Sequence, residues 1–331
     1  MVIFMKKKIF QLFTFLITIS LFLTGCQKEN NLDKNRISIV ATNFPAYDFA
    51  RSVVTKVDEN YLAPTNNFTN VDIKLLIKPG METHSFDPTP KDIIDIQNAD
   101  IFIYMGGHSE SWVEKILETS NKLPKKIIKL KDVVEITHNH EHHEAEHNHN
   151  EHEEDEHFWT DSKNAIKMIS TILENIIEVD NEKTNGKYIE EYQSNANSYI
   201  NQINKLSSEI KNTVDNSKNK FLIFGDRFPF IYFADEYGLE FISAFDGCSS
   251  AVEVKTSKLA ELIDIAKEKN AKAIFKIEMS NGKIAQTIAD ATDAKILELH
   301  SCQNVTKDDF NKGVTYAFTM NSNLNTLREG L

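Results

Sequence analysis

The chain has 331 residues, of which 41% are hydrophobic and 26% charged, and its formal net charge is −12. This composition is typical of a globular protein of one or two domains and leaves ample material for a core. Lysine and arginine number 37 against 49 acidic residues and form no basic stripe, so nucleic acid is not an expected partner. A cationic partner suits this charge better.

Residues 1–25 are predicted to form a secretory signal peptide. Three lysines (Lys6–Lys8) precede an apolar run over 9–23, which is too short for a comfortable membrane span of roughly 20 residues. The run ends in Leu-Thr-Gly-Cys, which resembles a bacterial lipobox. We therefore expect Cys26 to carry a lipid that anchors the protein to the outside of the bacterial membrane, with residues 26–35 as a polar tether. Ordinary cleavage beside a chance cysteine is the alternative.

Two sets of β-rich runs follow the tether. The first set is 36–42, 71–77, 99–105 and 125–130, and the second is 220–225, 239–245, 272–278 and 294–299. Segments of helical composition separate most of these runs, and such alternation predicts parallel sheets with crossover helices. The sequence therefore predicts an α/β protein of two lobes, over 36–160 and 219–331. We expect each lobe to hold a mainly parallel four-stranded sheet with flanking helices.

Residues 161–218, between the lobes, contain no strand signal. Apolar residues recur at helical spacing from Ala165 to Ile177, after an expected cap at Asp161, and again from Tyr192 to Val214. The second stripe predicts one helix over about 185–214, roughly 45 Å long at 1.5 Å per residue. Such a helix would join the lobes rigidly and leave a cleft between them.

The segment 138–156 consists largely of histidine and acidic residues and predicts a disordered loop. We expect its histidines to act as auxiliary metal ligands of low affinity: His138, His140, His142, His143, His147, His149 and His152. His157 differs from them, because Phe158 and Trp159 follow it and mark the return to folded chain.

His84 is the second histidine with a structural context. Pro79-Gly80 ends a predicted strand, and Thr89-Pro90-Lys91-Asp92 is typical of a helix start. His84 is therefore expected on a loop after the carboxyl end of a strand, where open α/β sheets bind their ligands. A single loop histidine is nevertheless more often a surface residue than a ligand.

The stretches GMETHSFDPTPKD and DEHFWTDSKNA, separated by the acidic histidine-rich loop, resemble the zinc- and manganese-binding lipoproteins of bacterial ABC importers. The resemblance continues through RFPFIYFADEYGLEF to TYAFTMNSNLNTLREGL and so covers nearly the whole mature chain. It implies a monomeric solute-binding protein that holds a metal ion between its lobes and hands it to a membrane permease. The histidine-rich loop favours the zinc branch.

The resemblance implies four metal ligands, two from each lobe. His84 and His157 match the two histidines of the first lobe. Asp226 is the only candidate for the third, and it requires a one-residue shift, because an ungapped match selects Arg227, which cannot ligate. The fourth position, an acid in the family, falls near His300. Three imidazoles and one carboxylate suit tetrahedral Zn²⁺ better than Mn²⁺, which favours oxygen ligands.

Cys248 and Cys302 remain once Cys26 is acylated. An even pair in an exported protein favours a disulfide. Thiolate ligation of the metal is the alternative, because Cys302 lies two residues from His300.

Two other functions compete with zinc import. A zinc-dependent hydrolase would be expected to carry a motif such as His-Glu-x-x-His on a helix, and here that spacing occurs only as HEAEH (143–147), inside the low-complexity histidine-rich loop. No Gly-x-Ser-x-Gly elbow or P-loop occurs, so we do not expect an enzyme. A surface metal buffer or adhesin, with the histidine-rich loop as its functional part, is the second alternative.

Overall fold

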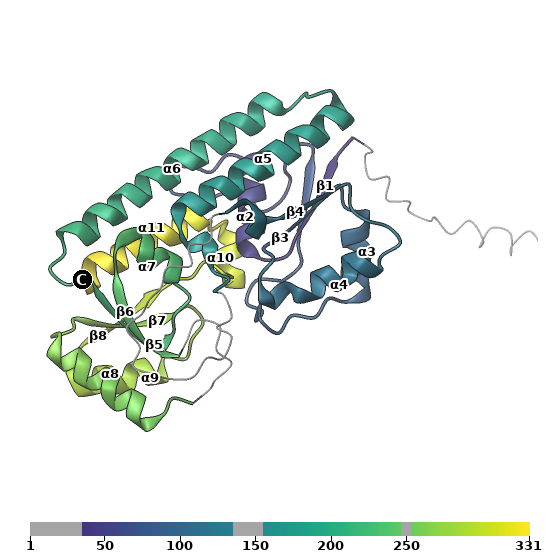
Figure 1. Ribbon diagram of the computed structural model, residues 1–331. Coiled ribbons are helices and arrows are strands. Elements are labelled where there is room, and N and C mark those ends of the chain that lie inside the picture. The colour runs from purple at the N-terminus through teal and green to yellow at the C-terminus, as the bar shows by residue number, and fades with distance from the viewer. Residues whose placement is uncertain (1–34, 135–154, 246–252) are drawn as a thin grey trace, which may run out of the picture. The chain divides into compact units, whose positions relative to one another are not determined.

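The computed structural model describes residues 35–134, 155–245 and 253–331, nearly all of which belong to one compact unit, Ile37–Leu331 (Figure 1). Three predictions fall outside the described residues: the signal peptide with the lipidated Cys26, the auxiliary ligands of the histidine-rich loop, and Cys248. Among the helices that the structure describes, none is both long and apolar enough to span a bilayer.

The first lobe contains the predicted four-stranded sheet. Its strands are β1 (Ile37–Ala41), β2 (Val71–Leu75), β3 (Ile101–Tyr104) and β4 (Lys126–Lys129). They are parallel and lie in the order β2-β1-β3-β4. The inner strands β1 and β3 are almost wholly buried, which accounts for the unbroken apolar runs in the sequence.

The second lobe repeats this topology. Its strands are β5 (Phe221–Arg227), β6 (Glu240–Phe245), β7 (Ala273–Ile277) and β8 (Lys295–Leu299), again parallel, in the order β6-β5-β7-β8. The pairing of β5 with β6 is irregular between Phe224 and Arg227, where β5 holds one residue more than its partner. This bulge lies at the carboxyl end of β5, and bulges commonly redirect side chains next to functional sites.

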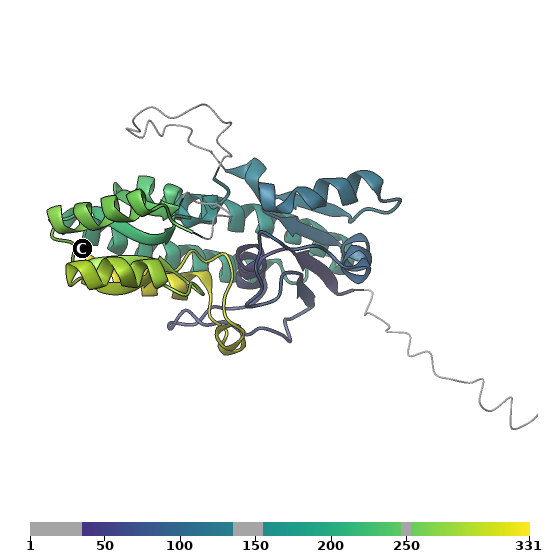
Figure 2. The same ribbon diagram turned by 90° about the horizontal axis from the view of Figure 1, so that it is seen from below.

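Helices cover both faces of each sheet. In the first lobe these are α2 (Phe44–Val54), α3 (Pro90–Asn98) and α4 (Ser111–Thr119), with three-residue turns of 3-10 helix at His108–Glu110 and Phe158–Thr160 and a longer one at Leu130–Val133. In the second they are α7 (Ile231–Tyr237), α8 (Thr256–Glu268), α9 (Lys283–Thr292) and α11 (Tyr316–Gly330). The short α10 (Lys307–Lys312) packs Phe310 against Tyr47 of α2 in the first lobe. The helix start predicted at Thr89 is a complete capping box with Asp92. Figures 1 and 2 show α8 and α9 side by side against the second sheet.

Two long helices connect the lobes. α5 (Ser162–Thr184) starts at the predicted cap, Asp161, and α6 (Ile189–Asn216) is the predicted long helix. With 28 residues, α6 is about 42 Å long and packs against α2 in one lobe and α7 and α11 in the other (Figure 1). It begins later than predicted because Asn185 ends α5 in the left-handed conformation, with φ of 59°.

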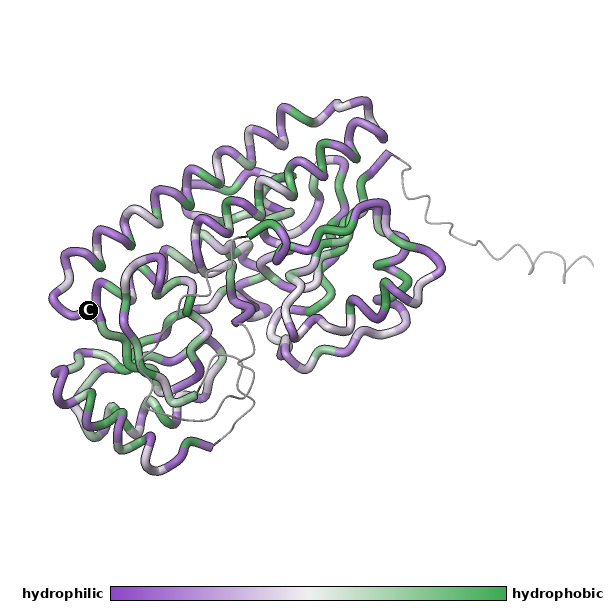
Figure 3. The backbone as a smooth tube through the Cα atoms, viewed as in Figure 1, coloured by the Kyte–Doolittle hydropathy of each residue, from purple (hydrophilic) through white to green (hydrophobic). Residues whose placement is uncertain are grey.

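The main hydrophobic core is shared between the lobes. One continuous cluster contains residues from both sheets and from α2, α5, α6, α7 and α11, while smaller clusters lie under α3 and α4 and under α8 and α9. Figure 3 shows the strands as mainly hydrophobic and α6 as mainly hydrophilic with apolar residues at intervals. The shared core therefore fixes the two lobes against a common helical layer.

Candidate metal centre

A cavity of about 350 Å³ lies between residues of both lobes. The first lobe contributes the loop after β2, Met81 to His84, and His157. The second contributes the carboxyl ends of β5 and β7 and the segment after β8. Ligand sites of parallel α/β sheets are expected at these strand ends.

The structure brings His84 and His157 together on this cavity, with ring centroids 5.9 Å apart. His157 is buried and packs its ring edge-on against Trp159, as expected from the apolar residues that follow it. His84 is partly exposed on its loop. Two imidazoles this close together can both coordinate one metal ion.

Contacts from the second lobe hold both histidines in place. Asn304 donates its amide N–H groups to the carbonyls of Lys78 (3.2 Å) and Met81 (2.8 Å) in the loop that carries His84. The Trp159 indole N–H donates to the carbonyl of Ser301 at 2.8 Å. The segment after β8 therefore contacts both histidine-bearing parts of the first lobe.

Two consecutive carboxylates, Asp155 and Glu156, lie against the rings of the two histidines. Asp155 Oδ1 is 3.1 Å from Nδ1 of His157, and Glu156 Oε1 is 3.1 Å from Nδ1 of His84. Burial raises the pKa of Glu156, but hydrogen bonds from His84 and Ser109 outweigh it and lower the pKa to about 2. The disordered loop predicted over 138–156 included both residues, and this is wrong for Glu156, which is only 5% exposed and packed in the fold.

Asp226 lies on the same cavity, at the bulge of β5. Its Oδ1 accepts the backbone N–H of Arg227 at 2.9 Å, while its Oδ2 is buried without a hydrogen-bond partner in the described chain. Buried carboxylate oxygens are normally satisfied, so this atom is available to a cation. Arg227 lines the cavity as well.

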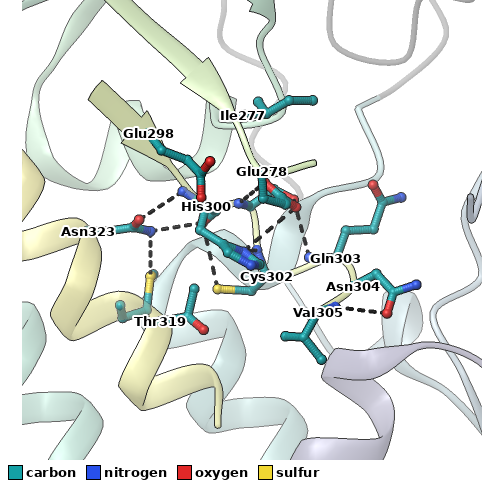
Figure 4. Close-up of polar contacts among 12 residues, drawn as sticks. Ile277, Glu278, Glu298, His300, Cys302, Gln303, Asn304, Val305, Thr319 and Asn323 are labelled. Atoms are coloured by element: carbon teal, nitrogen blue, oxygen red, sulfur yellow. Dashed lines mark hydrogen bonds and ion pairs between the residues drawn. The ribbon is translucent and has the colours of Figure 1, made fainter. Parts of the chain in front are cut away.

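His300 is not among the residues that line the cavity. Its Nδ1 accepts the backbone N–H of Cys302 at 3.0 Å and lies 3.7 Å from Glu278 Oε1, as Figure 4 shows. Because Nδ1 is an acceptor, the proton of the neutral ring is on Nε2, which cannot then coordinate a metal. Asn323 fixes the His300 backbone through two hydrogen bonds of 2.8 Å.

Gln303 reaches the cavity where His300 does not. Its Nε2 is 3.2 Å from Nε2 of His84, the ring nitrogen opposite the one that faces Glu156. Gln303 was not predicted from the sequence, although it follows β8, where a ligand-contacting side chain is expected. In the chain that the structure describes, no three His, Cys, Asp or Glu side chains gather closely enough to hold one metal ion.

Cys302 is completely buried next to this segment. Burial raises the pKa of its thiol well above the ordinary value, and the negative charge of Glu278 adds to the effect. A thiol in this environment is protonated at neutral pH and is a poor metal ligand. The predicted disulfide remains a prediction, because Cys248 is outside the described residues.

Two parallel-sheet lobes that share a core and flank a cavity with adjacent imidazoles define a two-lobed solute-binding protein. The chain belongs to the family described as zinc-uptake complex component A, periplasmic (ZnuA), which matches residues 39–330 and confirms the resemblance. The high-affinity zinc uptake system protein ZnuA of Bacillus subtilis is 32% identical over 301 residues, covering 90% of this chain and 88% of that protein. Zinc-binding lipoprotein AdcA of Streptococcus pneumoniae is 28% identical over 314 residues, which are 94% of this chain but 58% of AdcA.

Solved structures agree with this assignment. The metal-dependent lipoprotein YcdH of Bacillus subtilis superposes with a TM-score of 0.71 at 27% identity, covering 89% of this chain and 100% of that one. The Zn(II)-bound ZnuA-like domain of Streptococcus pneumoniae AdcA gives 0.70 at 25% identity, covering 89% and 98%. The predicted fold class is therefore confirmed.

Proposed function

We propose that this protein captures Zn²⁺ outside the cytoplasm and delivers it to the permease of an ABC importer. The observation that carries the proposal is the pair of adjacent imidazoles, His84 and His157, on a cavity between the lobes. The names of the Bacillus and Streptococcus relatives, which refer to zinc uptake and zinc binding, agree with it. Zinc is the cargo here, and we expect no enzymatic turnover.

We propose His84, His157, Asp226 and His300 as the zinc ligands. Nitrogen and oxygen donors in this ratio suit tetrahedral Zn²⁺, and Mn²⁺ should bind more weakly because it favours oxygen. The partnerless Oδ2 supports Asp226. His300 must turn its ring away from the N–H of Cys302 before it can coordinate.

Metal content and zinc titration of the purified mature protein test this set. We expect one tight equivalent of zinc, and alanine at His84 or His157 should weaken binding by orders of magnitude. His300→Ala and Gln303→Ala form a matched pair, because the two residues leave β8 three positions apart. Gln303→Ala should not weaken binding, because Gln303 contacts the ring nitrogen of His84 that the ion would take. If His300→Ala binds zinc like the wild type, His300 is not a ligand, and if Asp226→Ala does so too, both second-lobe assignments are wrong.

We further propose that acylated Cys26 anchors a monomeric protein to the membrane beside its permease. The support is the lipobox-like Leu-Thr-Gly-Cys after a short apolar run and the Streptococcus pneumoniae relative's name, which calls it a lipoprotein. Cys26→Ala should move the protein from the membrane fraction to the soluble fraction. A soluble wild type would contradict the anchor, and a dimer in size-exclusion chromatography would contradict the monomer.

The histidine-rich loop is proposed to be a collector of low affinity. Its imidazoles and carboxylates each offer partial coordination, but ordering them costs about 1–2 kcal/mol per residue. Deleting 138–152 should remove weak zinc sites and keep the tight one. Loss of the tight site would instead support the surface-buffer alternative, and zinc-dependent turnover of a peptide or ester would support the hydrolase.

Cys248 and Cys302 are proposed to form a disulfide in the exported protein. Two cysteines remain after acylation, which is the even number that a disulfide needs. Burial raises the pKa of the Cys302 thiol, and a protonated thiol is a poor metal ligand, so ligation is disfavoured. Thiol titration of denatured, unreduced and zinc-free protein should then find neither cysteine free. Two free thiols that only zinc protects would indicate ligation instead.

A further inference from the structure

We propose that Asp155 and Glu156 are positioning residues that orient the two imidazoles of the metal site and select the ring nitrogen that binds the ion. This inference rests on the function proposed above. It assigns a role to two residues that precede His157 and that the ligand set does not include.

The first step is the geometry of the two contacts. Asp155 Oδ1 lies 3.1 Å from Nδ1 of His157 and also accepts the backbone N–H of His157 at 2.8 Å. Glu156 Oε1 lies 3.1 Å from Nδ1 of His84, which comes from a different loop. Each histidine therefore has its own carboxylate, and both carboxylates come from adjacent positions in the chain.

The second step is the chemistry of these contacts. A carboxylate accepts hydrogen bonds, so it favours the tautomer that carries the hydrogen on Nδ1 of the adjacent ring. Oε1 of Glu156 is buried and makes no hydrogen bond in the described chain, so an Nδ1–H on His84, whose Nδ1 lies 3.1 Å away, is a donor that would satisfy it. In a neutral imidazole this leaves the lone pair on Nε2. For His84, Nε2 points to the cavity, because it contacts the amide of Gln303, which lines it. Metal-binding histidines commonly donate their second N–H to a carboxylate in this way, which fixes tautomer and ring orientation.

The third step is that Glu156 is itself held rigidly. It is 5% exposed, and its Oε2 accepts the backbone N–H of Ser109 at 3.0 Å. The chain around it makes room for it at Gly107, where an added Cβ would lie 2.2 Å from Oε2 and 2.6 Å from Cβ of Glu156. Glu156 thus connects the loop of His84 to the segment of His157 before any ion binds.

The test is the zinc affinity of Glu156→Ala, measured by competition with a chromophoric chelator, together with the absorption spectrum of the Co²⁺-loaded protein. We expect zinc affinity to fall roughly 10- to 100-fold, as for other partners of metal-binding histidines, and the Co²⁺ bands to change. Glu156→Gln keeps an oxygen that can accept from Nδ1 of His84 and should recover most of the affinity. Asp155→Ala and Asp155→Asn should behave in the same way through His157.

Two further variants separate positioning from charge and from misfolding. Asp87→Ala removes an exposed carboxylate from the loop that carries His84 and does not line the cavity, so it should leave affinity and spectrum nearly unchanged. Gly107→Ala should displace Glu156 without altering any carboxylate, and should weaken binding even if Glu156→Ala does not fold. Thermal unfolding of the metal-free variants checks that they are folded.

Two results would overturn the proposal. One is wild-type affinity and an unchanged Co²⁺ spectrum in Glu156→Ala. The other is an equal loss of affinity in Glu156→Ala, Glu156→Gln and Asp87→Ala with an unchanged spectrum, because the loss would then come from the removed negative charge alone. Failure of the proposed function looks different, because the wild type itself would then bind no tight zinc.

Discussion

Glu110 is a buried carboxyl group whose ionisation should make the stability of this protein depend on pH. It lies in the turn of 3-10 helix before α4, is 3% exposed, and accepts the backbone N–H of Gly106 at 2.8 Å. Burial is the largest cause that raises its pKa, from 4.5 to about 7, and the nearby charge of Glu156 adds to it. Hydrogen bonds such as that from Gly106 oppose the shift without cancelling it.

The sign and size of the effect follow from this shift. Between pH 4.5 and about 7, folded Glu110 retains a proton that the unfolded chain releases, so the free energy of unfolding falls as the pH rises. The full shift corresponds to about 3 kcal/mol, of which about 2–3 kcal/mol is lost between pH 5 and 8. Glu110→Gln removes this titration and keeps an oxygen that can accept the N–H of Gly106.

Urea unfolding of metal-free protein at pH 5, 6, 7 and 8 measures the effect. We expect Glu110→Gln to gain about 2–3 kcal/mol over the wild type between pH 5 and 8. Glu118→Gln, an exposed position on α4, is the matched control and should differ from the wild type by a constant amount. If the difference between Glu110→Gln and the wild type is the same at every pH, Glu110 does not titrate in this range and the reasoning is wrong.

Three further predictions concern the core, the second sheet and the metal site. Asp48→Ala should lower the free energy of unfolding by about 3–5 kcal/mol, because it leaves the fully buried guanidinium of Arg51 without the carboxylate that its Nε contacts at 3.0 Å. Thermal or urea unfolding measures this, and a loss below about 1 kcal/mol would contradict it. Gly225→Ala should destabilise the protein by about 1–3 kcal/mol, since the new Cβ would lie 2.4 Å from the backbone of Ala285 in α9. It should also weaken zinc binding at the adjacent, proposed ligand Asp226, and an unchanged melting temperature would refute the close approach. In protein without the histidine-rich loop, zinc affinity should fall steeply on acidification from pH 8 to 5, because imidazoles coordinate only when neutral, and a slope of one decade per pH unit or less would exclude a site with three histidines.

The fold could be predicted from the sequence because its strongest signals are periodic and local. The inner strands are buried on both faces, so each appears as an apolar run whatever its neighbours are. The predicted start of α6 was less accurate, since the observed start depends on the left-handed conformation of Asn185, which hydrophobic periodicity does not encode. Local caps such as Asp161, by contrast, are evident in the sequence.

The candidate site could be predicted only in part, because half of its contacts join distant parts of the chain. His84 and His157 stood out through a strand end and an apolar anchor. Glu156 did not, since seven other acids precede it in the histidine-rich loop and only its burial distinguishes it. The contact of Gln303 with His84 spans 219 positions, and an uncharged amide offers no sequence signal of metal binding.

The contact between Gln303 and His84 also bears on how zinc would bind and leave. Nε2 of His84 has one lone pair, so the N–H of Gln303 and a zinc ion compete for it. Gln303 belongs to the segment after β8, and its neighbour Asn304 holds the His84 loop through the carbonyls of Lys78 and Met81. If His84 binds zinc as proposed, capture of the ion would replace the contact of Gln303 between the lobes with a metal bond. Loss of the ion would restore the Gln303 contact, so Gln303→Ala should strengthen zinc binding, and weaker binding in this variant would refute the competition.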